Sequence, residues 1–361
     1  MNHIRGLIVW LYAASCGTLL GLASDNSSPT ARFNMVIVVG AGGTQEYTDQ
    51  FAAWAEQWSA IGERAGALVT TIGIDAAEDA QEIQDAQRQQ QVQDAQRLQQ
   101  VIATMQPSEA ASNQPHWLIL IGHGTFQNNV AKFNLHGPDL TADQLANWLA
   151  ALKHPLVIVN TASASGPFVN ALSGENRIVV TATKSGSEQN WARFGGYLPK
   201  AIANAASDLD HDDEVSLLEA VLKAASDTGE FYTSEGRIRT EHAILDDNGD
   251  RLGTPAEMLG AVLKTTAAVD PKNISATPTA PQFDGDVAAK TILIPATDVA
   301  ALSNEEVIER ARIEAELLSL RKKKASLGED EYFGQLEKWM RELAALYRAA
   351  EKRANSSASS P

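Results

Sequence analysis

Five short runs of apolar and β-branched residues constrain the fold of this chain more than any other feature of its sequence. A glycine or a small polar residue follows each run, and the runs occupy residues 34–39, 67–72, 117–121, 156–159 and 178–182. Continuous runs of this kind are typical of strands buried on both faces of a parallel sheet. Segments with helical spacing separate them, as in 50–66 and 141–152. The alternation predicts an α/β fold of three layers with a mostly parallel central sheet.

The composition narrows the classes of function. Among 361 residues, 45 Asp and Glu face 29 Lys and Arg, which leaves a formal net charge of −16. Because no basic stripe accompanies this excess, we expect no nucleic-acid partner, and the acidity suits cation binding instead. The single cysteine is Cys16, close to the N-terminus. The body of the chain therefore has no disulfide, no thiolate metal site and no thiol nucleophile.

The N-terminus has the pattern of an export signal. Arg5 precedes the apolar segment 6–14, and small residues at 21–23 offer a cleavage point before Ser24. We therefore expect residues 1–23 to be a signal peptide and the mature protein to be periplasmic or secreted. Lipidation at Cys16 is a minor alternative. A retained membrane anchor is the other, although the apolar run is shorter than the ~20 residues that a span needs.

Two of the loops that follow predicted strands carry residues suited to catalysis. His123 lies between two glycines, and Ser163 lies in a turn of small residues. In a parallel sheet these loops meet beyond the carboxyl ends of the strands, where ligands bind. A histidine can act as a general base, a serine as a nucleophile, and the N–H of Gly124 as an oxyanion donor. Such residues are also common in loops without catalysis, so the pairing alone does not establish an enzyme.

A set of motifs gives these positions a family context. In chain order they are LILIGHGT (118–125), FNLHGPDLTADQL (133–145), PLVIVNTASASGPF (155–168), RIVVTATKSG (177–186) and TEHAILDDNG (240–249). The set resembles the legumain-type family of caspase-like cysteine peptidases, and most of all its bacterial exported relatives. The resemblance covers about 34–253 and implies the caspase–hemoglobinase fold, with a parallel-centred sheet between helices, for a domain at 33–265.

The chain departs from this family at the residues that perform its chemistry. His123 matches the family's histidine, but Ser163 stands where the family has its nucleophilic cysteine. Gly42 matches the position of an assisting asparagine in legumains, and Thr48 replaces an arginine that helps to bind an asparagine side chain. Because a serine hydroxyl stays protonated where a thiol can ionise, this exchange is not conservative. Cysteine peptidase activity is excluded, and asparaginyl specificity is unsupported.

Three functions remain open from the sequence. The first is a non-catalytic pseudopeptidase that binds a peptide or protein partner in its cleft, as a binding or scaffold module. The second is a peptidase or amidase with Ser163 as nucleophile and His123 as base. The third is a structural protein that acts through its C-terminal helices. We expect the first.

The segment 208–219 has the spacing of an EF-hand calcium loop. Oxygen ligands fall at loop positions 1, 3, 5, 7, 9 and 12, which are Asp208, Asp210, Asp212, the Glu214 backbone, Ser216 and Glu219. Asp213 replaces the usual glycine at position 6, which strains the turn without forbidding it. We expect a calcium ion here; the alternative is an acidic loop that caps the following helix.

A second acidic run offers fewer ligands. Asp246, Asn248 and Asp250 alternate along the chain, but the distal bidentate carboxylate of a calcium loop is missing. A second metal site and a tight turn are both compatible with this pattern, and the turn is the simpler interpretation.

The remaining segments complete the expected organisation. The Gln-rich stretch 76–106 is predicted to be an exposed helical insertion, and 266–302 a linker with one possible extra strand at 290–295. A capping box at Ser303 and Glu306 begins a helical hairpin over 303–353, with a break at 327–328. Its apolar stripe would pack on the main domain or mediate oligomerisation. We expect the tail, 354–361, to be disordered.

Overall fold

The computed structural model describes residues 33–74, 93–105, 114–210, 212, 214–259, 284–295, 304–324 and 327–358. The predicted signal peptide, Cys16, Ser303 and most of the predicted linker lie outside these residues. No helix in the described part of the chain has the length and apolar character needed to cross a membrane.

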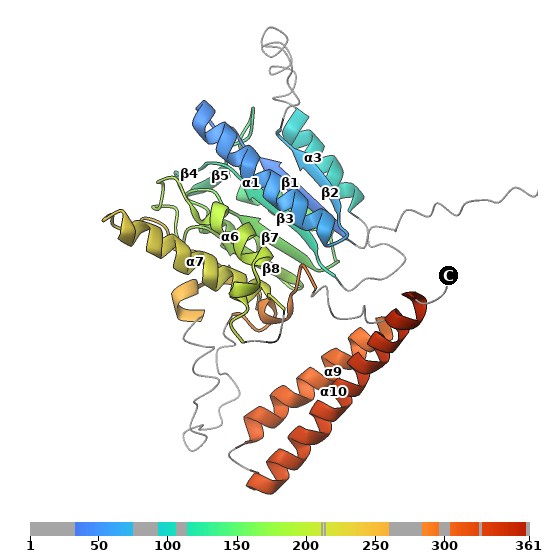
Figure 1. The fold of residues 1–361 in the computed structure, drawn as a ribbon. Coiled ribbons are helices and arrows are strands. Elements are labelled where there is room, and N and C mark those ends of the chain that lie inside the picture. Colours follow the sequence, from blue (N-terminus) through green and yellow to red (C-terminus); the bar gives the residue numbers. More distant parts are fainter. Residues whose placement is uncertain are drawn as a thin grey trace, which may run out of the picture. The chain divides into compact units, whose positions relative to one another are not determined.

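A seven-stranded sheet forms the centre of the main domain (Figure 1). Its strand order is β10-β9-β8-β7-β3-β1-β2, and the first five strands of the chain in this sheet run parallel. Only β9 and β10 are antiparallel to their neighbours. This arrangement confirms the predicted α/β class and mostly parallel sheet. The strands are β1 (Asn34–Val39), β2 (Leu68–Ile72), β3 (His116–Ile121), β7 (Leu156–Asn160), β8 (Arg177–Thr181), β9 (Ile244–Asp246) and β10 (Thr254–Pro255).

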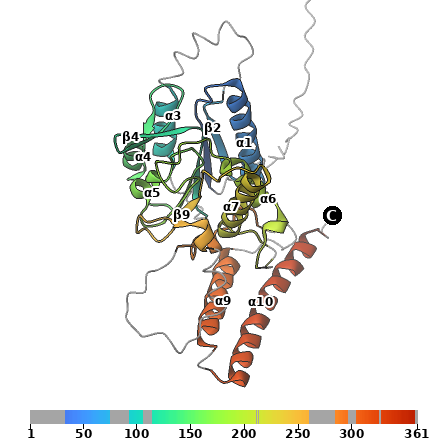
Figure 2. The ribbon, with the colours of Figure 1, turned by 90° about the vertical axis from the view of Figure 1, so that its left-hand side faces the viewer.

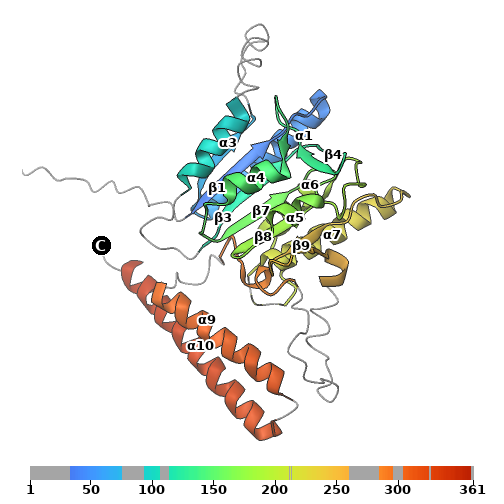
Figure 3. The same cartoon turned by 180° about the vertical axis from the view of Figure 1, so that it is seen from behind.

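Helices cover both faces of this sheet, which gives the three predicted layers (Figure 2). In β1, Met35 and Ile37 pack on one side while Val36 and Val38 pack on the other, as the two-residue period of a strand requires. The first face is covered by α1 (Gln45–Arg64), α6 (Phe194–Ala203) and α7 (Leu217–Ser234). The second is covered by α3 (Gln93–Thr104), α4 (Ala142–Leu149) and α5 (Pro167–Leu172), seen in Figure 3.

The described part of the Gln-rich stretch, residues 93–105, is packed more closely against the domain than its polar composition suggests. Helix α3 buries Leu98 and Ile102, and Met105 after it is buried too, all three against the second face of the sheet. Three apolar residues at spacings of three and four are enough to form one buried stripe on an otherwise polar helix. The predicted helix is therefore present at 93–104, with its polar face exposed and one apolar stripe buried, while 76–92 lie outside the described residues.

A small second sheet follows His123 and was not foreseen from the sequence. Strands β4 (Gly124–Gln127), β5 (Val130–Phe133) and β6 (Leu140–Thr141) pair antiparallel. Asn128 and Asn129 connect the first two with φ of 51° and 63°. Asparagine tolerates these left-handed angles, which a two-residue hairpin turn of this type requires. The hairpin places Gly124 on a fixed strand directly after the candidate histidine.

Two consecutive glycines let α6 approach α1 closely. A Cβ on Gly196 would lie 2.8 Å from the Trp54 ring, and one on Gly195 would lie equally close to the Thr161 side chain. Larger residues would force the two helices apart, because these contacts involve a buried ring and a buried side chain. The glycine pair therefore sets the distance between the two helices that border the candidate site.

The segments after the main domain differ in two places from the prediction. Instead of a strand at 290–295, the chain forms a short 3-10 helix η3 (Ala288–Lys290) and a single bridge between Ile292 and Ser216. The hairpin is present as α9 (Asn304–Lys323) and α10 (Glu329–Ala358). Helix α10 extends to Ala358, so 354–358 are helical rather than part of a disordered tail. Ion pairs from Arg312 to Glu342 and from Arg353 to Glu306 join the two helices.

A buried histidine pair lies at the opposite edge of the sheet from the candidate site. His116 begins β3 and is 2% exposed; its Nδ1 accepts a hydrogen bond from the Asn34 N–H at 3.1 Å. The His154 ring lies 4.3 Å away, centroid to centroid. Burial, and secondarily the neighbouring His154, lowers the pKa of His116 from 6.5 to about 4. The folded chain therefore holds a neutral imidazole at this position at neutral pH.

This histidine should make the stability of the protein depend on pH. At a pH between the pKa of His116 in the folded chain and its pKa in the unfolded chain, the unfolded chain binds more protons. The free energy of unfolding therefore falls as the pH decreases from about 6.5 toward 4. We expect a loss of about 2 kcal/mol between pH 7 and pH 5 from His116 alone. Urea unfolding at both pH values should show this loss in the wild type and not in His116→Asn. An identical pH dependence in the two proteins would contradict the assignment.

Candidate functional site

His123 is held by aromatic side chains on the carboxyl-end edge of the sheet. It follows β3, and its ring lies edge-on to Tyr47 and Phe51 of α1, with centroid distances of 4.8 and 5.1 Å. Gly122, the residue before it, packs closely on the small second sheet, because a Cβ there would lie 3.0 Å from the Phe133 ring. The ring therefore packs against helix α1, while the residue before it packs on the small second sheet.

Burial disfavours the protonated form of this imidazole. Loss of solvent around the ring lowers the pKa of His123, and a hydrogen bond between the ring and the Gly42 backbone works in the opposite direction. Gly42 stands where the resembled family has an asparagine side chain. A Cβ at Gly42 would lie 2.5 Å from Thr48 Oγ1, so a side chain there would displace α1. The backbone of Gly42 thus orients the ring in this chain.

Ser163 forms hydrogen bonds with Gly124, the residue after the candidate histidine, and not with His123 itself. The Gly124 N–H donates to Ser163 Oγ, and Ser163 Oγ donates to the Gly124 carbonyl, both at 3.2 Å. Between these two described residues, Ser163 and His123, there is no hydrogen bond. Ser163 is also buried, with 3% of its surface exposed. The Gly124 N–H that was predicted as an oxyanion donor is therefore occupied by the serine itself.

The turn that carries Ser163 has a strained backbone. Ala164 adopts a φ of 52° although it has neither the freedom of glycine nor the polar side chain of asparagine. Such a conformation costs on the order of 1–3 kcal/mol and persists only where its surroundings enforce it. The Ala164 N–H donates to the Glu188 carbonyl at 2.8 Å, which holds the turn in place. The surrounding contacts therefore hold the Ser163 turn in a conformation that alanine rarely adopts.

Buried hydroxyls connect this turn to the loop after β8. Ser165 Oγ lies 3.1 Å from Thr183 Oγ1, and the Gly166 N–H donates to the same Thr183 oxygen. Ser165 and Thr183 are fully buried. The loops at 123, 163 and 183 thus meet at one edge of the sheet, as the order of strands and helices in the sequence predicted.

Sequence reasoning missed a carboxylate–imidazole pair beside this turn. Glu188 Oε1 lies 2.6 Å from His242 Nδ1, while Glu188 Oε2 accepts the N–H groups of Lys184 and His242. His242 and Glu188 lie 54 residues apart in the sequence, and no spacing rule connects them. Both belong to or directly follow quoted motifs, and this was the signal available. The pair joins the β8 loop to the segment before β9.

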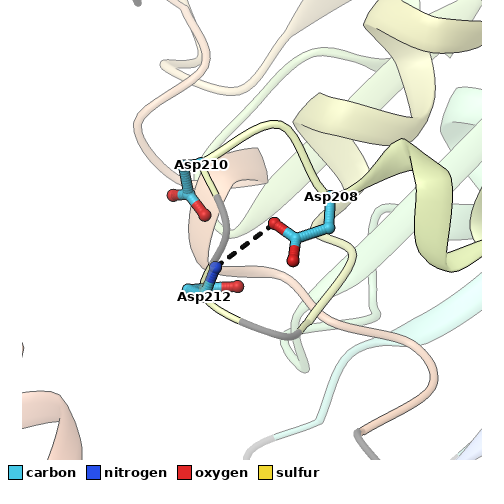
Figure 4. Close-up of side chains that lie close together, drawn as sticks. All are labelled: Asp208, Asp210 and Asp212. Atoms are coloured by element: carbon cyan, nitrogen blue, oxygen red, sulfur yellow. Dashed lines mark hydrogen bonds between the residues drawn. The ribbon is translucent and has the colours of Figure 1, made fainter.

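The acidic loop gathers three of the predicted calcium ligands. Asp208, Asp210 and Asp212 each place a carboxylate oxygen within 4.8 Å of the others, and this is the only such group of acidic or histidine side chains in the described part of the chain. In Figure 4 the three side chains surround the turn of the loop, and the Asp212 N–H donates to Asp208 Oδ1 at 3.2 Å. Partial burial, and next the nearby charges of Asp210, Glu214 and Glu219, raise the pKa of Asp212 to about 6.

Glu219, predicted as the ligand at loop position 12, makes hydrogen bonds within the loop and to the start of the next helix. One carboxylate oxygen accepts the N–H groups of Leu209 and Asp210 at 2.7 and 3.2 Å, and the other accepts the Ser216 N–H and hydroxyl at 2.8 Å. Ser216 in turn accepts the Glu219 N–H, which completes a capping box at the start of α7. The residues predicted at positions 9 and 12 therefore fold the loop onto the helix.

The second acidic run is arranged as a turn. Asp246 is fully buried and accepts hydrogen bonds from the Ser173 hydroxyl and the Gly249 N–H. Asn248 and Asp250 bond to each other, and Asp250 Oδ1 also accepts the Leu252 N–H at 2.7 Å. The side chains of all three residues thus make hydrogen bonds within the turn or to residues beside it.

Comparisons with known proteins find solved structures that are similar to this chain. No family model matches the sequence, and no curated protein matches it. Caspase-1 from Spodoptera frugiperda is similar in structure at 9% identity and a TM-score of 0.37, over 60% of this chain and 86% of that one. The Drosophila initiator caspase Dronc is similar at 13% identity and a TM-score of 0.35, over 70% and 95% of the two chains.

Proposed function

We propose that this chain is an exported, non-catalytic relative of legumain-type peptidases that binds a peptide or protein partner at the edge formed by the loops at 123, 163 and 183. The observation that supports this best is the state of Ser163. Its hydroxyl is buried and satisfied by both polar groups of the Gly124 backbone, while the His123 ring is bonded to the Gly42 backbone instead.

A catalytic serine needs a base within hydrogen-bond reach and a free oxyanion donor. In this chain, Ser163 could meet these requirements only by breaking hydrogen bonds that the folded chain already makes. Attack by Ser163 would require its bond to the Gly124 carbonyl to break, and release of the Gly124 N–H would break the second. A buried hydroxyl that gives up such bonds without replacement loses about 1–3 kcal/mol. The same geometry suits a rigid surface that holds a ligand without reacting.

Incubation of the mature protein with a synthetic peptide library tests this proposal. We expect immobilised protein to retain a subset of peptides and mass spectrometry to find them intact. Retention should fall in Tyr47→Ala, because the Tyr47 ring packs against both His123 and Trp191 at this edge. Cleavage that disappears in both Ser163→Ala and His123→Ala would overturn the proposal, as would retention of no peptide at all.

A serine-dependent hydrolase is the second candidate, and one observation favours it. The His123 ring is neutral at pH 7 and oriented by a main-chain group, which are the two properties of a general base. In the peptide-library experiment, cleaved peptides would indicate the hydrolase, and retained intact peptides would indicate the binding module.

We further propose that the loop at 208–219 binds calcium. Three carboxylates converge within 4.8 Å, and burial, followed by the charges of Asp210, Glu214 and Glu219, raises the pKa of Asp212. Calcium takes six to eight oxygen ligands, which the three aspartates, the Glu214 carbonyl and water would supply. The engagement of Glu219 in the capping box leaves a site without its usual bidentate ligand. We therefore expect the weak range of extracellular sites, about 10⁻⁴–10⁻³ M, which exported proteins encounter.

Calcium should raise the melting temperature of the folded protein. A hundredfold excess over the dissociation constant contributes about 2.7 kcal/mol, or about 5–10 °C for a domain of this size. The rise should disappear in Asp210→Asn and persist in Asp250→Asn, which removes an acid from the other run. Glu219 is a poor choice for this test, because its loss removes the helix cap in either buffer. Equal melting temperatures of the wild type in calcium and in chelator would contradict the site.

A further inference from the structure

Strand β2 is an edge of the central sheet that nothing in its sequence shields. In the described part of the chain it pairs only with β1, and this pairing is continuous over the whole strand, without a bulge. Proteins usually protect such an edge, with its row of free backbone N–H and C=O groups, by charged side chains, proline, a bulge or a covering segment. Residues 66–74 contain neither a charged residue nor a proline. The edge is therefore open to pairing with another strand.

The strand at the opposite end of the sheet is shielded. β10 has only two residues, and one of them is Pro255, which has no N–H to donate. The Thr254 N–H and hydroxyl both donate to one carboxylate oxygen of Asp284, at 3.1 and 2.6 Å. A further strand would have to displace these hydrogen bonds at β10, whereas at β2 it would find backbone groups without a partner.

The register of β2 on β1 determines which of its backbone groups face outward. The Leu68 N–H donates to the Phe33 carbonyl at 2.8 Å, so the backbone groups of Leu68 are directed toward β1. Because this direction alternates along a strand, Thr70 also bonds toward β1, while the N–H and C=O groups of Val69 and Thr71 face away from it. These outward groups make no backbone hydrogen bond on that side within the described residues.

A second copy of the same strand satisfies these outward groups. In an antiparallel pair with a two-fold axis at Thr70, Val69 lies opposite Thr71 of the partner subunit, and Thr71 lies opposite Val69 of the partner subunit. Residues whose groups face outward form the hydrogen-bonded pairs of such a ladder, with two bonds in each pair. Thr70 then faces its own copy in the non-bonded pair between them, which is a favourable threonine–threonine contact.

The side chains at this edge also suit a second copy. Leu68 is 56% exposed, and Ile74, just beyond the strand, is 43% exposed. In the two-fold register Leu68 lies opposite Ile72 of the partner subunit, so apolar burial adds to the hydrogen bonds. A formal net charge of −16 makes two copies repel each other over much of their surface. Because residues 66–74 carry no charge, the two paired strands bring no like charges together.

We propose that two copies of this chain pair antiparallel through β2, so that their sheets join into one continuous sheet across a two-fold axis. Such an interface is isologous, so it closes at a dimer and leaves neither β2 edge exposed. The carboxyl ends of the strands then point in opposite directions in the two copies. The pairing does not depend on the proposed binding function, but together they give a module with two partner-binding edges that face away from each other.

Analytical ultracentrifugation of the mature protein between about 2 and 200 µM tests this pairing. We expect the average mass to rise with concentration toward that of a dimer. Thr70→Lys should stay monomeric, because two identical charges would face each other at the two-fold axis, and Thr70→Glu should stay monomeric for the same reason. An equimolar mixture of the two variants should form a dimer again, because opposite charges then meet. A monomeric mixture, or a monomeric wild type at the highest concentration, would overturn the proposal.

Three further variants control for other causes. Asn147→Lys adds the same charge at an exposed position of α4 and should dimerise like the wild type. Thr71→Pro removes an outward N–H from each copy without removing a bond to β1, so it should weaken the dimer at least about tenfold. Phe333 is an exposed side chain of the helical hairpin. A dimer that is lost in Phe333→Glu and kept in Thr70→Lys would place the contact in the hairpin and contradict the proposal.

Discussion

Gly124→Ala should destabilise the protein by more than about 3 kcal/mol, although it adds only a single methyl group. A Cβ at this position would lie 2.3 Å from the Ser163 carbonyl oxygen and 3.1 Å from the Lys132 carbonyl. Both are backbone atoms of strained or paired segments, so neither can move without breaking the Ser163 turn or the β4–β5 ladder. Urea unfolding measures the change.

Substitutions at two other glycines of the same domain provide comparisons for the stability of Gly124→Ala. A Cβ on Gly122 would meet only the Phe133 ring at 3.0 Å and a Cα at 3.2 Å, so Gly122→Ala should cost less. A Cβ on Gly229 in α7 would meet the end of a flexible arginine side chain at 3.5 Å. Gly229→Ala should stabilise the helix by up to about 1 kcal/mol. A Gly124→Ala variant as stable as Gly229→Ala would contradict the close approach of the two loops.

Glu241→Gln should cost about 3–4 kcal/mol, because it replaces an acceptor of four hydrogen bonds with a group that also donates. Glu241 is 1% exposed and accepts from the Arg193 N–H at both oxygens, from the Phe194 N–H and from the Tyr232 hydroxyl. Burial raises the pKa of Glu241, and these hydrogen bonds oppose that change. In the glutamine variant an amide N–H would face backbone N–H groups at the start of α6.

The matched substitution is Glu235→Gln at the exposed end of α7, which should change the free energy of unfolding by less than about 0.5 kcal/mol. Both variants lose one negative charge, so a common effect of net charge cancels in the comparison. Similar stabilities of the two variants would mean that the Glu241 carboxylate does not hold the start of α6. The nuclear magnetic resonance signal of the Trp191 indole N–H should also change in Glu241→Gln, since Arg193 lies against that ring.

The sequence predicted those parts of the fold that depend on short-range pattern. Strand β1 coincides with the predicted run, and Thr141, where the segment with helical spacing begins, is an N-cap with Gln144 as its capping-box partner. Burial of Phe51, Ala55, Trp58 and Ile61 in α1 also follows from their spacing. In each case a hydrophobic period or a local hydrogen bond determines the structure within a few residues.

The candidate site could be predicted only in outline. Parallel topology places the loops at 123 and 163 on one edge, but the hydrogen bonds between Ser163 and Gly124 depend on backbone positions 39 residues apart. The Glu188–His242 pair and the seat of Arg193 on Phe231 depend on similar long-range packing. Short strands such as β4 and β5 have too few residues for a clear period, and their Asn-Asn turn lacks the glycine that usually signals a hairpin.

The role of Glu219 shows how one spacing supports two structures. An EF-hand loop needs a carboxylate at its twelfth position, and a capping box needs one three residues after the N-cap serine. Ser216 and Glu219 satisfy both patterns. The structure shows the capping box, and the loop also folds back and brings the N–H groups of Leu209 and Asp210 onto the same carboxylate.

Labelling of the mature protein with a fluorophosphonate tests the central claim most directly, since this reagent reacts with activated serines whatever their natural substrate. The account predicts no adduct on Ser163, because the hydroxyl is buried, bonded to Gly124 and not in contact with a base. A known serine hydrolase in the same tube verifies the reagent, and peptide mapping locates any adduct. An adduct on Ser163 in the wild type that is lost in His123→Ala would contradict the claim and identify the chain as a serine hydrolase.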